Sequence, residues 1–411
     1  MAAGNYHTVL LGSAGSAVAF GDDSFGQCDV PLPPEGIAYV AAAAGHSHTV
    51  LVRSDGVAIA AGHDRNGHCE VPQPPDGLGY TEAAAGDGHT VLLRSDGVVV
   101  AFGRNSAGQC NVPQLPPGMA YVAVAAGRSH TVLVRSDGMA VAFGYDRSGQ
   151  TAVPPLPILH ESSESAAVSY RCAAAGRSHS VLVRSDGEAM AFGSNGSGQC
   201  SVPPLPAEGR YVAAAAGDNH TLLVRADGEA VAFGHNGCDQ CAVPPRPEGI
   251  AYIGAMANGK HSVLLRSDGV AIAFGSNQYA QCEVPPPFPN QSYVLPACGS
   301  GADVVLTLHA QPAENEAEGE GAEHGLQVSC ATLSGAKVAA FRIDGDAALP
   351  EVPADKELLL GMARVSVARQ LRLPACRVKL VLPDGTLLSE REDSLPARSL
   401  LCDRTMKSDS V

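Results

Sequence analysis

The chain has 411 residues, of which 45% are hydrophobic, and this is enough for a large core and for more than one domain. Its net charge of −15 argues against non-specific binding of nucleic acids through their phosphates. No apolar run reaches the ~18 residues of a membrane span, and the first residues lack the charged-then-apolar pattern of a signal peptide.

Residues 1 to about 310 consist of one unit that recurs seven times, and each copy is headed by a histidine. A fixed period of this size is typical of a solenoid or a propeller. The histidines are 41 residues apart, except for one interval of 49: His7, His48, His89, His130, His179, His220 and His261. The additional residues of the long interval lie in the polar loop Ile158–Val168.

The clearest copy of the unit is Gly86–Ala126. Thr90–Arg94 and Val98–Phe102 are rich in β-forming residues and flank an Asp-Gly turn, which is typical of a hairpin. A short third strand is expected over Gln109–Val112, and Tyr121–Ala126 reads as an alanine-rich fourth strand. The pattern predicts an all-β fold, a seven-bladed β-propeller of four-stranded blades.

The first copy begins partway through the unit and lacks its own alanine-rich strand. Tyr293–Cys298 is a candidate replacement, which would close the ring with strands from both ends of the repeat region. Val304–Leu308 also reads as a strand, and the sequence leaves its partner open. We therefore expect the propeller to occupy residues 1–310.

The repeated histidines and cysteines favour structural roles. An active site is assembled once per domain, whereas these residues recur in every copy or nearly so. We expect each histidine to bond backbone within its blade, with a seven-histidine metal ring as the alternative. Six cysteines share one repeat position, where a buried small side chain is the simplest interpretation: Cys28, Cys69, Cys110, Cys200, Cys241 and Cys282. Free thiols fit the cytoplasm or nucleus, and no cofactor or metal is expected.

Residues 311–325 are rich in glutamate and read as an acidic disordered linker. Residues 326–411 predict a small α+β domain in the order β-β-α-β-β, with its helix over Asp355–Leu373. This order suggests a β-grasp fold. Leu373–Leu382 resembles the segment after the helix in ubiquitin-like domains, and the resemblance would place a hydrophobic binding patch at Val381. The chain ends without a diglycine, so conjugation is not expected.

The recurring Gly-x-x-His-[Ser/Thr], Asp-Gly and Phe-Gly-x-[Asn/Asp]-x-x-Gly-Gln-Cys elements resemble the regulator of chromosome condensation repeat. That resemblance implies a seven-bladed propeller. Members of the family include a guanine-nucleotide exchange factor, propellers attached to HECT-type ubiquitin ligases, and a plant ultraviolet-B photoreceptor. The chain contains no tryptophan, which argues against indole-based light sensing.

A binding site should lie where the copies differ. The first and third loops of each blade share a face, because successive strands alternate in direction. Charged and polar residues vary there, and an ordinary solvated surface is the alternative interpretation. We predict a partner-binding surface at these positions: Asn5, His46, Asp87, Arg104, Arg128, Tyr145, Arg177, Asp218 and Lys260. On the opposite face, the arginines of the hairpin turns are expected to pair with nearby aspartates.

Together these features predict a non-catalytic scaffold for protein–protein interaction. We expect a cytoplasmic or nuclear monomer that binds neither nucleic acid nor membrane directly. Two alternatives remain open: a guanine-nucleotide exchange factor for a small GTPase, and a ubiquitin-pathway adaptor or a fragment of a HECT-type ubiquitin ligase.

Overall fold

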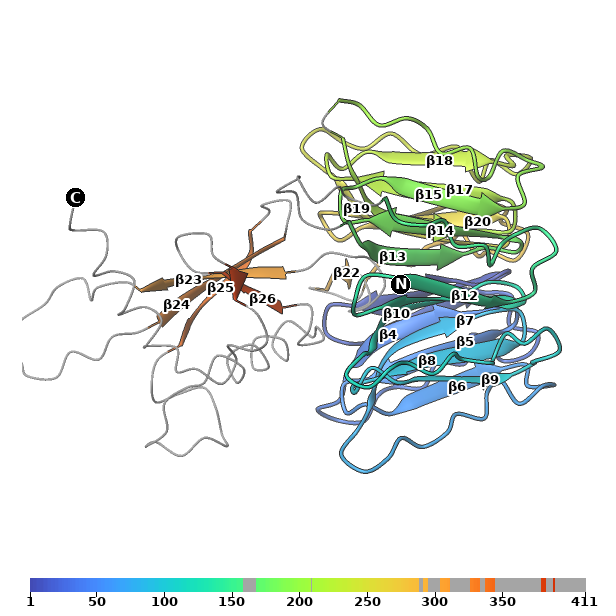
Figure 1. Ribbon diagram of the computed structural model, residues 1–411, viewed down its shortest axis with the longest axis horizontal. Coiled ribbons are helices and arrows are strands. Elements are labelled where there is room, and N and C mark those ends of the chain that lie inside the picture. Colours follow the sequence, from blue (N-terminus) through green and yellow to red (C-terminus); the bar gives the residue numbers. More distant parts are fainter. Residues whose placement is uncertain are drawn as a thin grey trace, which may run out of the picture. The chain divides into compact units, whose positions relative to one another are not determined.

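The computed structural model describes residues 1–157, 168–207, 209–287 and 291–294, and five later strands (Figure 1). The chain divides into two units, Met1–Gly301 and Ala302–Val411. Every regular element in the described ranges is a β-strand. Among these residues, no helix has the length and apolar character that crossing a membrane requires.

Repeated three-stranded antiparallel sheets build the first unit, one sheet for each histidine-headed copy after the first. Three sheets come from the first half of the unit: β4 (Tyr39–Ala44), β5 (His48–Arg53) and β6 (Ala58–Gly62); β7 (Tyr80–Ala85), β8 (His89–Arg94) and β9 (Val99–Gly103); β10 (Tyr121–Ala126), β11 (His130–Arg135) and β12 (Ala140–Gly144). Three come from the second half: β13 (Tyr170–Ala175), β14 (His179–Arg184) and β15 (Ala189–Gly193); β16 (Tyr211–Ala216), β17 (His220–Arg225) and β18 (Ala230–Gly234); β19 (Tyr252–Asn258), β20 (His261–Arg266) and β21 (Ala271–Gly275).

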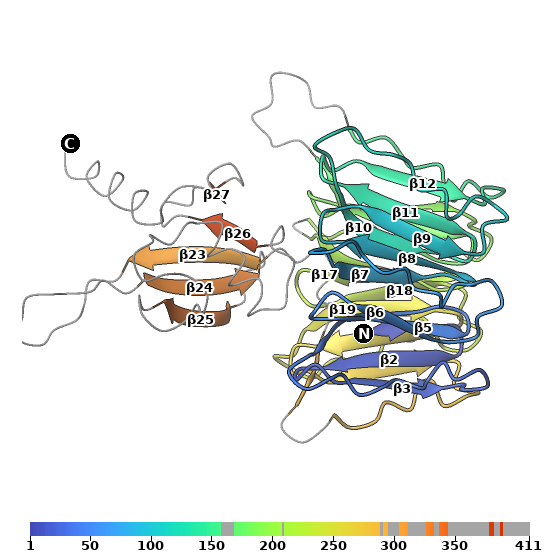
Figure 2. The same ribbon diagram turned by 90° about the horizontal axis from the view of Figure 1, so that it is seen from below.

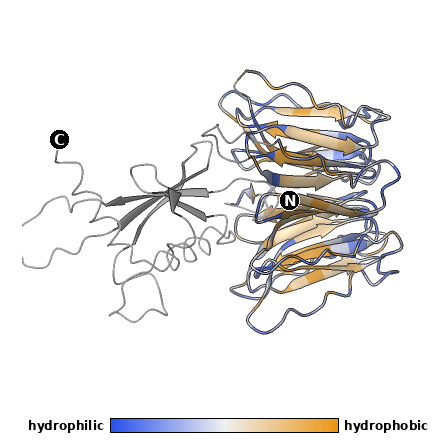
Figure 3. Cartoon of the chain, in the orientation of Figure 1, coloured by the Kyte–Doolittle hydropathy of each residue, from blue (hydrophilic) through white to orange (hydrophobic). Residues whose placement is uncertain are grey.

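The middle strand of each sheet is buried on both faces. In β8, Val91 and Leu92 point to opposite faces and are both fully buried, because neighbouring sheets cover each side. The hairpin to β9 turns at Asp96-Gly97, and Gly97 has a φ of 79° that suits this turn. Figure 3 shows hydrophobic strands joined by more hydrophilic loops. The all-β propeller and its hairpins are therefore confirmed.

The predicted third strand is wrong, and the sheets after the first have three strands rather than four. Within Gln109–Val112, backbone N–H groups donate to nearby acceptors in the same loop. The N–H of Cys110 donates to the Asn105 side chain, that of Asn111 to the Gly108 carbonyl and that of Val112 to the Cys110 carbonyl. Three of the four backbone donors are therefore unavailable to a strand ladder, and Pro113 has none. The cysteines of this loop are free and half-buried rather than fully buried.

The first sheet joins both ends of the repeat region. It contains β1 (Ala2–Ala3), β2 (His7–Gly12), β3 (Ala17–Gly21) and β22 (Tyr293–Val294). Both β1 and β22 pair with β2, at Thr8–Val9 and at Leu11–Gly12 respectively. The predicted closing strand is thus confirmed at Tyr293–Val294, and residues 295–298 lie outside the described range. The expectation that the first copy has no such strand of its own is wrong, because Ala2–Ala3 supplies part of it. Figure 2 shows the blue first sheet beside the yellow last one.

The second unit contains one five-stranded sheet in the order β25-β24-β23-β26-β27. Its strands are β23 (Val304–Ala310), β24 (Leu326–Thr332), β25 (Lys337–Ile343), β26 (Val378–Val381) and β27 (Leu387–Leu388). The strand expected at Val304–Leu308 therefore pairs here, with β24 and parallel to β26, and the unit boundary falls at Gly301 rather than at 310. The predicted linker 311–325 and the helix over 355–373 lie outside the described residues.

Val381, the residue predicted for a ubiquitin-like patch, lies in β26 opposite Thr307 and Leu387. The parallel pairing of β23 with β26 requires a crossover connection between them. The ubiquitin-like assignment of residues 326–411 stays a prediction.

Candidate functional site

Each repeated histidine connects its sheet to the next one. The imidazole Nε2 lies 2.9–3.1 Å from the hydroxyl of the second residue in the middle strand of the following sheet. The bonds link His7 to Thr49, His48 to Thr90, His89 to Thr131, His130 to Ser180, His179 to Thr221, His220 to Ser262 and His261 to Thr8. The last bond closes the circle. The expectation of a backbone bond within the same blade is wrong, because the side chains cross between sheets.

The hydroxyls fix the protonation state of these histidines. Each hydroxyl also lies 2.6–2.8 Å from a backbone carbonyl of the third loop, such as that of Gln109 for Thr131. The hydroxyl proton must go to that carbonyl, so Nε2 of the histidine is the donor. Nδ1 then carries no proton, and it has no hydrogen-bond partner within the described residues. Burial lowers the pKa of His89 to about 3 and that of His130 to about 4, so the rings are neutral.

The backbone just before each histidine places the variable residues around a central hollow. Arg128 and Arg177 donate their backbone N–H to the glycine carbonyl of the next sheet at 3.2 Å, and Asp218 does so at 2.9 Å. Asn5 and His46 make the corresponding bonds to Gly45 and Gly86. Five of the predicted residues therefore hold equivalent positions in five of the sheets.

The hollow is small and open to solvent, with a cavity volume of about 10 Å³, which is room for about one water molecule. Four predicted residues line it: Asp87, Arg128, Arg177 and Asp218. We call the surface formed by these four residues around the hollow the channel mouth. Nε of Arg128 donates to Oδ2 of Asp87 at 2.8 Å, while Arg177 is exposed and makes no ion pair within the described residues. Burial raises the pKa of Asp87, and His46 and Arg128 oppose that shift.

The remaining predicted residues lie outside the hollow. Nε of Arg104 donates to the Ser106 hydroxyl, and Tyr145 is exposed with the Arg147 guanidinium 6.0 Å from its ring centre. Lys260 is exposed and unpaired within the described part of the chain. These side chains do not line the hollow with the other four.

The structure also brings in residues that were not predicted. Asn258 lines the hollow, and its Nδ2 donates to the Ala44 carbonyl at 3.3 Å. The signal was present in the sequence, since the other six copies have glycine at this position. Tyr6 and Tyr279 are exposed, and their rings meet edge to face with centres 5.3 Å apart.

The opposite face carries neutralised arginines. Each hairpin turn pairs its arginine with the aspartate two residues later, as predicted: Arg53 with Asp55, Arg94 with Asp96, Arg135 with Asp137, Arg184 with Asp186 and Arg266 with Asp268. Arg225 and Asp227 make a sixth pair. The polar loop Ile158–Val168 lies outside the described residues except for Val168.

Residues 81–109, 121–150, 171–199 and 211–240 match the model of the regulator of chromosome condensation (RCC1) repeat. Among solved structures, Prp20p from Saccharomyces cerevisiae is 19% identical, with 64% of this chain and 78% of that chain covered and a TM-score of 0.51. Human WBSCR16 is 18% identical, with 59% and 77% covered and a TM-score of 0.50. The receptor kinase CR4 ectodomain from Physcomitrella patens is 16% identical, with 66% and 73% covered and a TM-score of 0.50. No curated protein sequence matches the chain. These similarities concern the fold alone.

Proposed function

We propose that this chain is a non-catalytic, seven-bladed scaffold, because it carries regulator of chromosome condensation (RCC1) repeats in a propeller. In this proposal the channel mouth binds a protein partner. The proposal rests on the difference between the two faces of the repeat unit.

One observation supports the choice of face. The arginines of the opposite face are each paired with an aspartate in their own turn, and such pairs leave little free charge for a partner. At the channel mouth, Arg177 and Asp218 make no ion pair within the described residues, and neither does Lys260 outside the hollow. Free charges of both signs, which differ from sheet to sheet, suit the steering and orientation of a charged protein surface.

The chemistry of the channel mouth suggests the character of the partner. Exposed Tyr6 and Tyr279 lie on the same side as the charged residues, and tyrosine and arginine are enriched at protein interfaces. Asp87 and Arg128 already satisfy each other, so Arg177 is the side chain most available to an incoming carboxylate. We expect a partner that presents an acidic group to the hollow.

The test is a double charge reversal, Arg128→Glu with Arg177→Glu. Once a partner has been identified by affinity capture with the wild-type chain, the variant should bind it at least about tenfold more weakly, because like charges then face each other. Equilibrium binding at low and moderate salt measures the change, and the wild-type affinity should fall as salt rises.

The matched control reverses two arginines of the opposite face, Arg94→Glu with Arg135→Glu. These residues form exposed pairs of small energy, so folding and binding should both stay close to wild type. If the control weakens binding and the channel-mouth variant does not, the proposed face is wrong.

A guanine-nucleotide exchange factor is the second candidate. Prp20p, which shares the fold, is described together with its binding properties to Gsp1p and histones. An exchange factor needs no chemical residues, only a surface that distorts the nucleotide site of its partner. Stimulated nucleotide release from any member of a panel of small GTPases would replace the scaffold proposal with this one.

A further inference from the structure

One loop in the second repeat departs from the other six. Where the others have glutamine, this repeat has His68: Gln27, Gln109, Gln150, Gln199, Gln240 and Gln281. Each glutamine accepts a hydrogen bond through Oε1 from the backbone two residues earlier. The His68 ring is only 2% exposed, and its Nδ1 has no hydrogen-bond partner within the described residues. A buried nitrogen in this state costs free energy unless something binds it.

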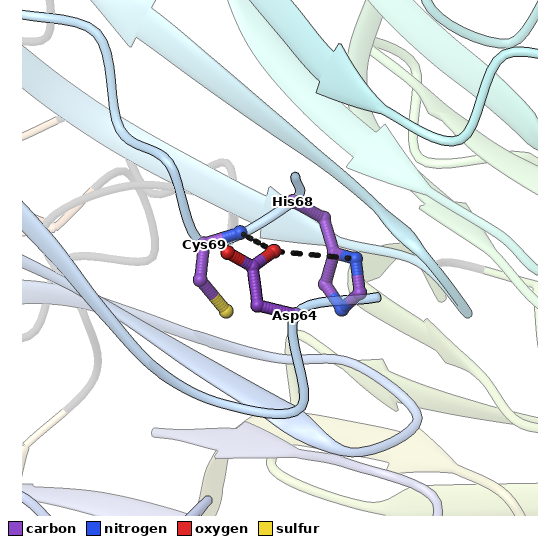
Figure 4. Close-up of side chains that lie close together, drawn as sticks. All are labelled: Asp64, His68 and Cys69. Atoms are coloured by element: carbon purple, nitrogen blue, oxygen red, sulfur yellow. Dashed lines mark hydrogen bonds and ion pairs between the residues drawn. The ribbon is translucent and has the colours of Figure 1, made fainter. Parts of the chain in front are cut away.

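Two other side chains that could bind a metal ion lie near this nitrogen. Nδ1 of His68 lies 3.9 Å from Oδ1 of Asp64, and the ligand atoms of Asp64, His68 and Cys69 all lie within 4.8 Å of one another (Figure 4). Asp64 and Cys69 are partly open to solvent, so an ion could reach them.

Asp64 and Cys69 also have structural contacts that recur in other repeats. Oδ1 of Asp64 accepts from the Cys69 backbone at 2.9 Å, as Oδ1 of Asn105 does from Cys110. These contacts leave Oδ2 of Asp64 and the lone pairs of the Cys69 sulfur available. His68 is the addition that converts an ordinary turn into a set of three donors.

We propose that Asp64, His68 and Cys69 form a binding site for a divalent transition-metal ion, with Zn²⁺ as the best match. The imidazole nitrogen and the carboxylate oxygen face each other at 3.9 Å without a hydrogen bond, a separation that a bound cation could bridge. An oxygen, a nitrogen and a sulfur donor are the ligands that Zn²⁺ takes in proteins. This proposal goes beyond partner binding and does not depend on it.

The site must tighten around the ion. Ligand bonds of 2.0–2.3 Å in tetrahedral sites require the donors to approach by about 1 Å, which rotation of the partly exposed Asp64 and Cys69 side chains can supply. Burial raises the pKa of Cys69 to about 12, and Asp64 adds to the shift, so the ion must displace the thiol proton. Three protein ligands leave a fourth position for water or for a donor from a partner.

The test uses the full chain with Zn²⁺, in competition with a chromophoric chelator, and with Co²⁺ as a spectroscopic probe. The wild-type chain should show a thiolate-to-cobalt charge-transfer band. His68→Gln installs the residue of the other six repeats, so the fold should be retained, as thermal unfolding would verify. This variant should bind Zn²⁺ at least about tenfold more weakly, the lower limit for loss of even an outer-shell partner.

A second variant, Cys69→Thr, installs the residue that the fourth repeat has at this position, Thr151. It should remove the charge-transfer band. Zn²⁺ affinity that is equal in the wild type and His68→Gln, a band that persists in Cys69→Thr, or the absence of any binding by the wild type would each overturn the proposal.

Discussion

Lowering the pH from 7 to about 5.5 is expected to unfold the repeat unit. Its seven connecting histidines are buried and neutral, and burial lowers the pKa of His7 and His179 to about 4 and that of His220 and His261 to about 3. Their ordinary value is 6.5, which applies in the unfolded chain. Between pH 6.5 and 4 the unfolded state therefore binds more protons, so stability is complete above pH 6.5 and is lost as the pH falls.

The expected effect is large because seven sites act together. Once the pH is below 6.5, each histidine lowers the free energy of unfolding by about 1.4 kcal/mol per pH unit. The net stability of a folded protein is only about 5–15 kcal/mol. Circular dichroism of thermal unfolding across this pH range measures the loss. Its steepness should correspond to several protons taken up per chain unfolded.

Salt provides the control for this prediction. Acid unfolding by repulsion between surface charges is relieved by added salt, whereas the cost of charging a buried imidazole is not. A transition that occurs only near pH 3, or one that moderate salt reverses, would contradict the role assigned to the histidines.

Gly127→Ala is expected to lower the free energy of unfolding by about 3 kcal/mol or more, at the upper end of the destabilisation caused by overpacking a core. A Cβ at this position would overlap Cε1 of His130 and the Gly176 carbonyl of the next sheet. Neither neighbour can give way, because one is a buried side chain held between sheets and the other is backbone. The melting temperature in thermal unfolding and the midpoint concentration in chemical unfolding should both drop accordingly.

Gly196→Ala is the matched control. A Cβ there meets nothing within 4 Å, and the residue is not among the glycines with positive φ. Its effect should stay within about 0.5 kcal/mol, as for ordinary surface substitutions. Equal stability of the two variants would mean that the close approach of the sheets at Gly127 is not needed.

The seventh repeat shows how the fold accommodates a larger residue at this position. Asn258 replaces the glycine, and β19 continues to Asn258, which pairs with His261. Gly259 then takes a φ of 49°, which a side chain rarely adopts. This local rearrangement directs the Asn258 side chain into the hollow.

Much of the fold could be predicted from periodicity, because the alternation of apolar residues and the Asp-Gly turns are local signals. Tyr121–Ala126 was predicted with the bounds that the structure gives it. The strand over Gln109–Val112 failed for a physical reason: side chains and turns within the loop take the backbone donors that a strand would use. The partner of Val304–Ala310 depends on long-range pairing, which no local pattern reveals.

The candidate site was predicted less completely. Variation between copies selected Asp87, Arg128, Arg177 and Asp218, and the structure places these four around one hollow. Two departures that occur in a single copy, Asn258 and His68, were missed because the repeat pattern directs attention to what the copies share. The histidine bonds between sheets were also missed, since they join residues 42 or 50 positions apart or, for His261 and Thr8, opposite ends of the repeat region.

The most direct test of the central claim is site-specific photo-crosslinking to the partner. A photoreactive residue would replace Arg177 at the channel mouth in one protein and Arg94 on the opposite face in another. The account predicts a partner adduct from position 177 and none from position 94. An adduct from position 94 alone would show that the face with paired arginines binds the partner, and would contradict the account.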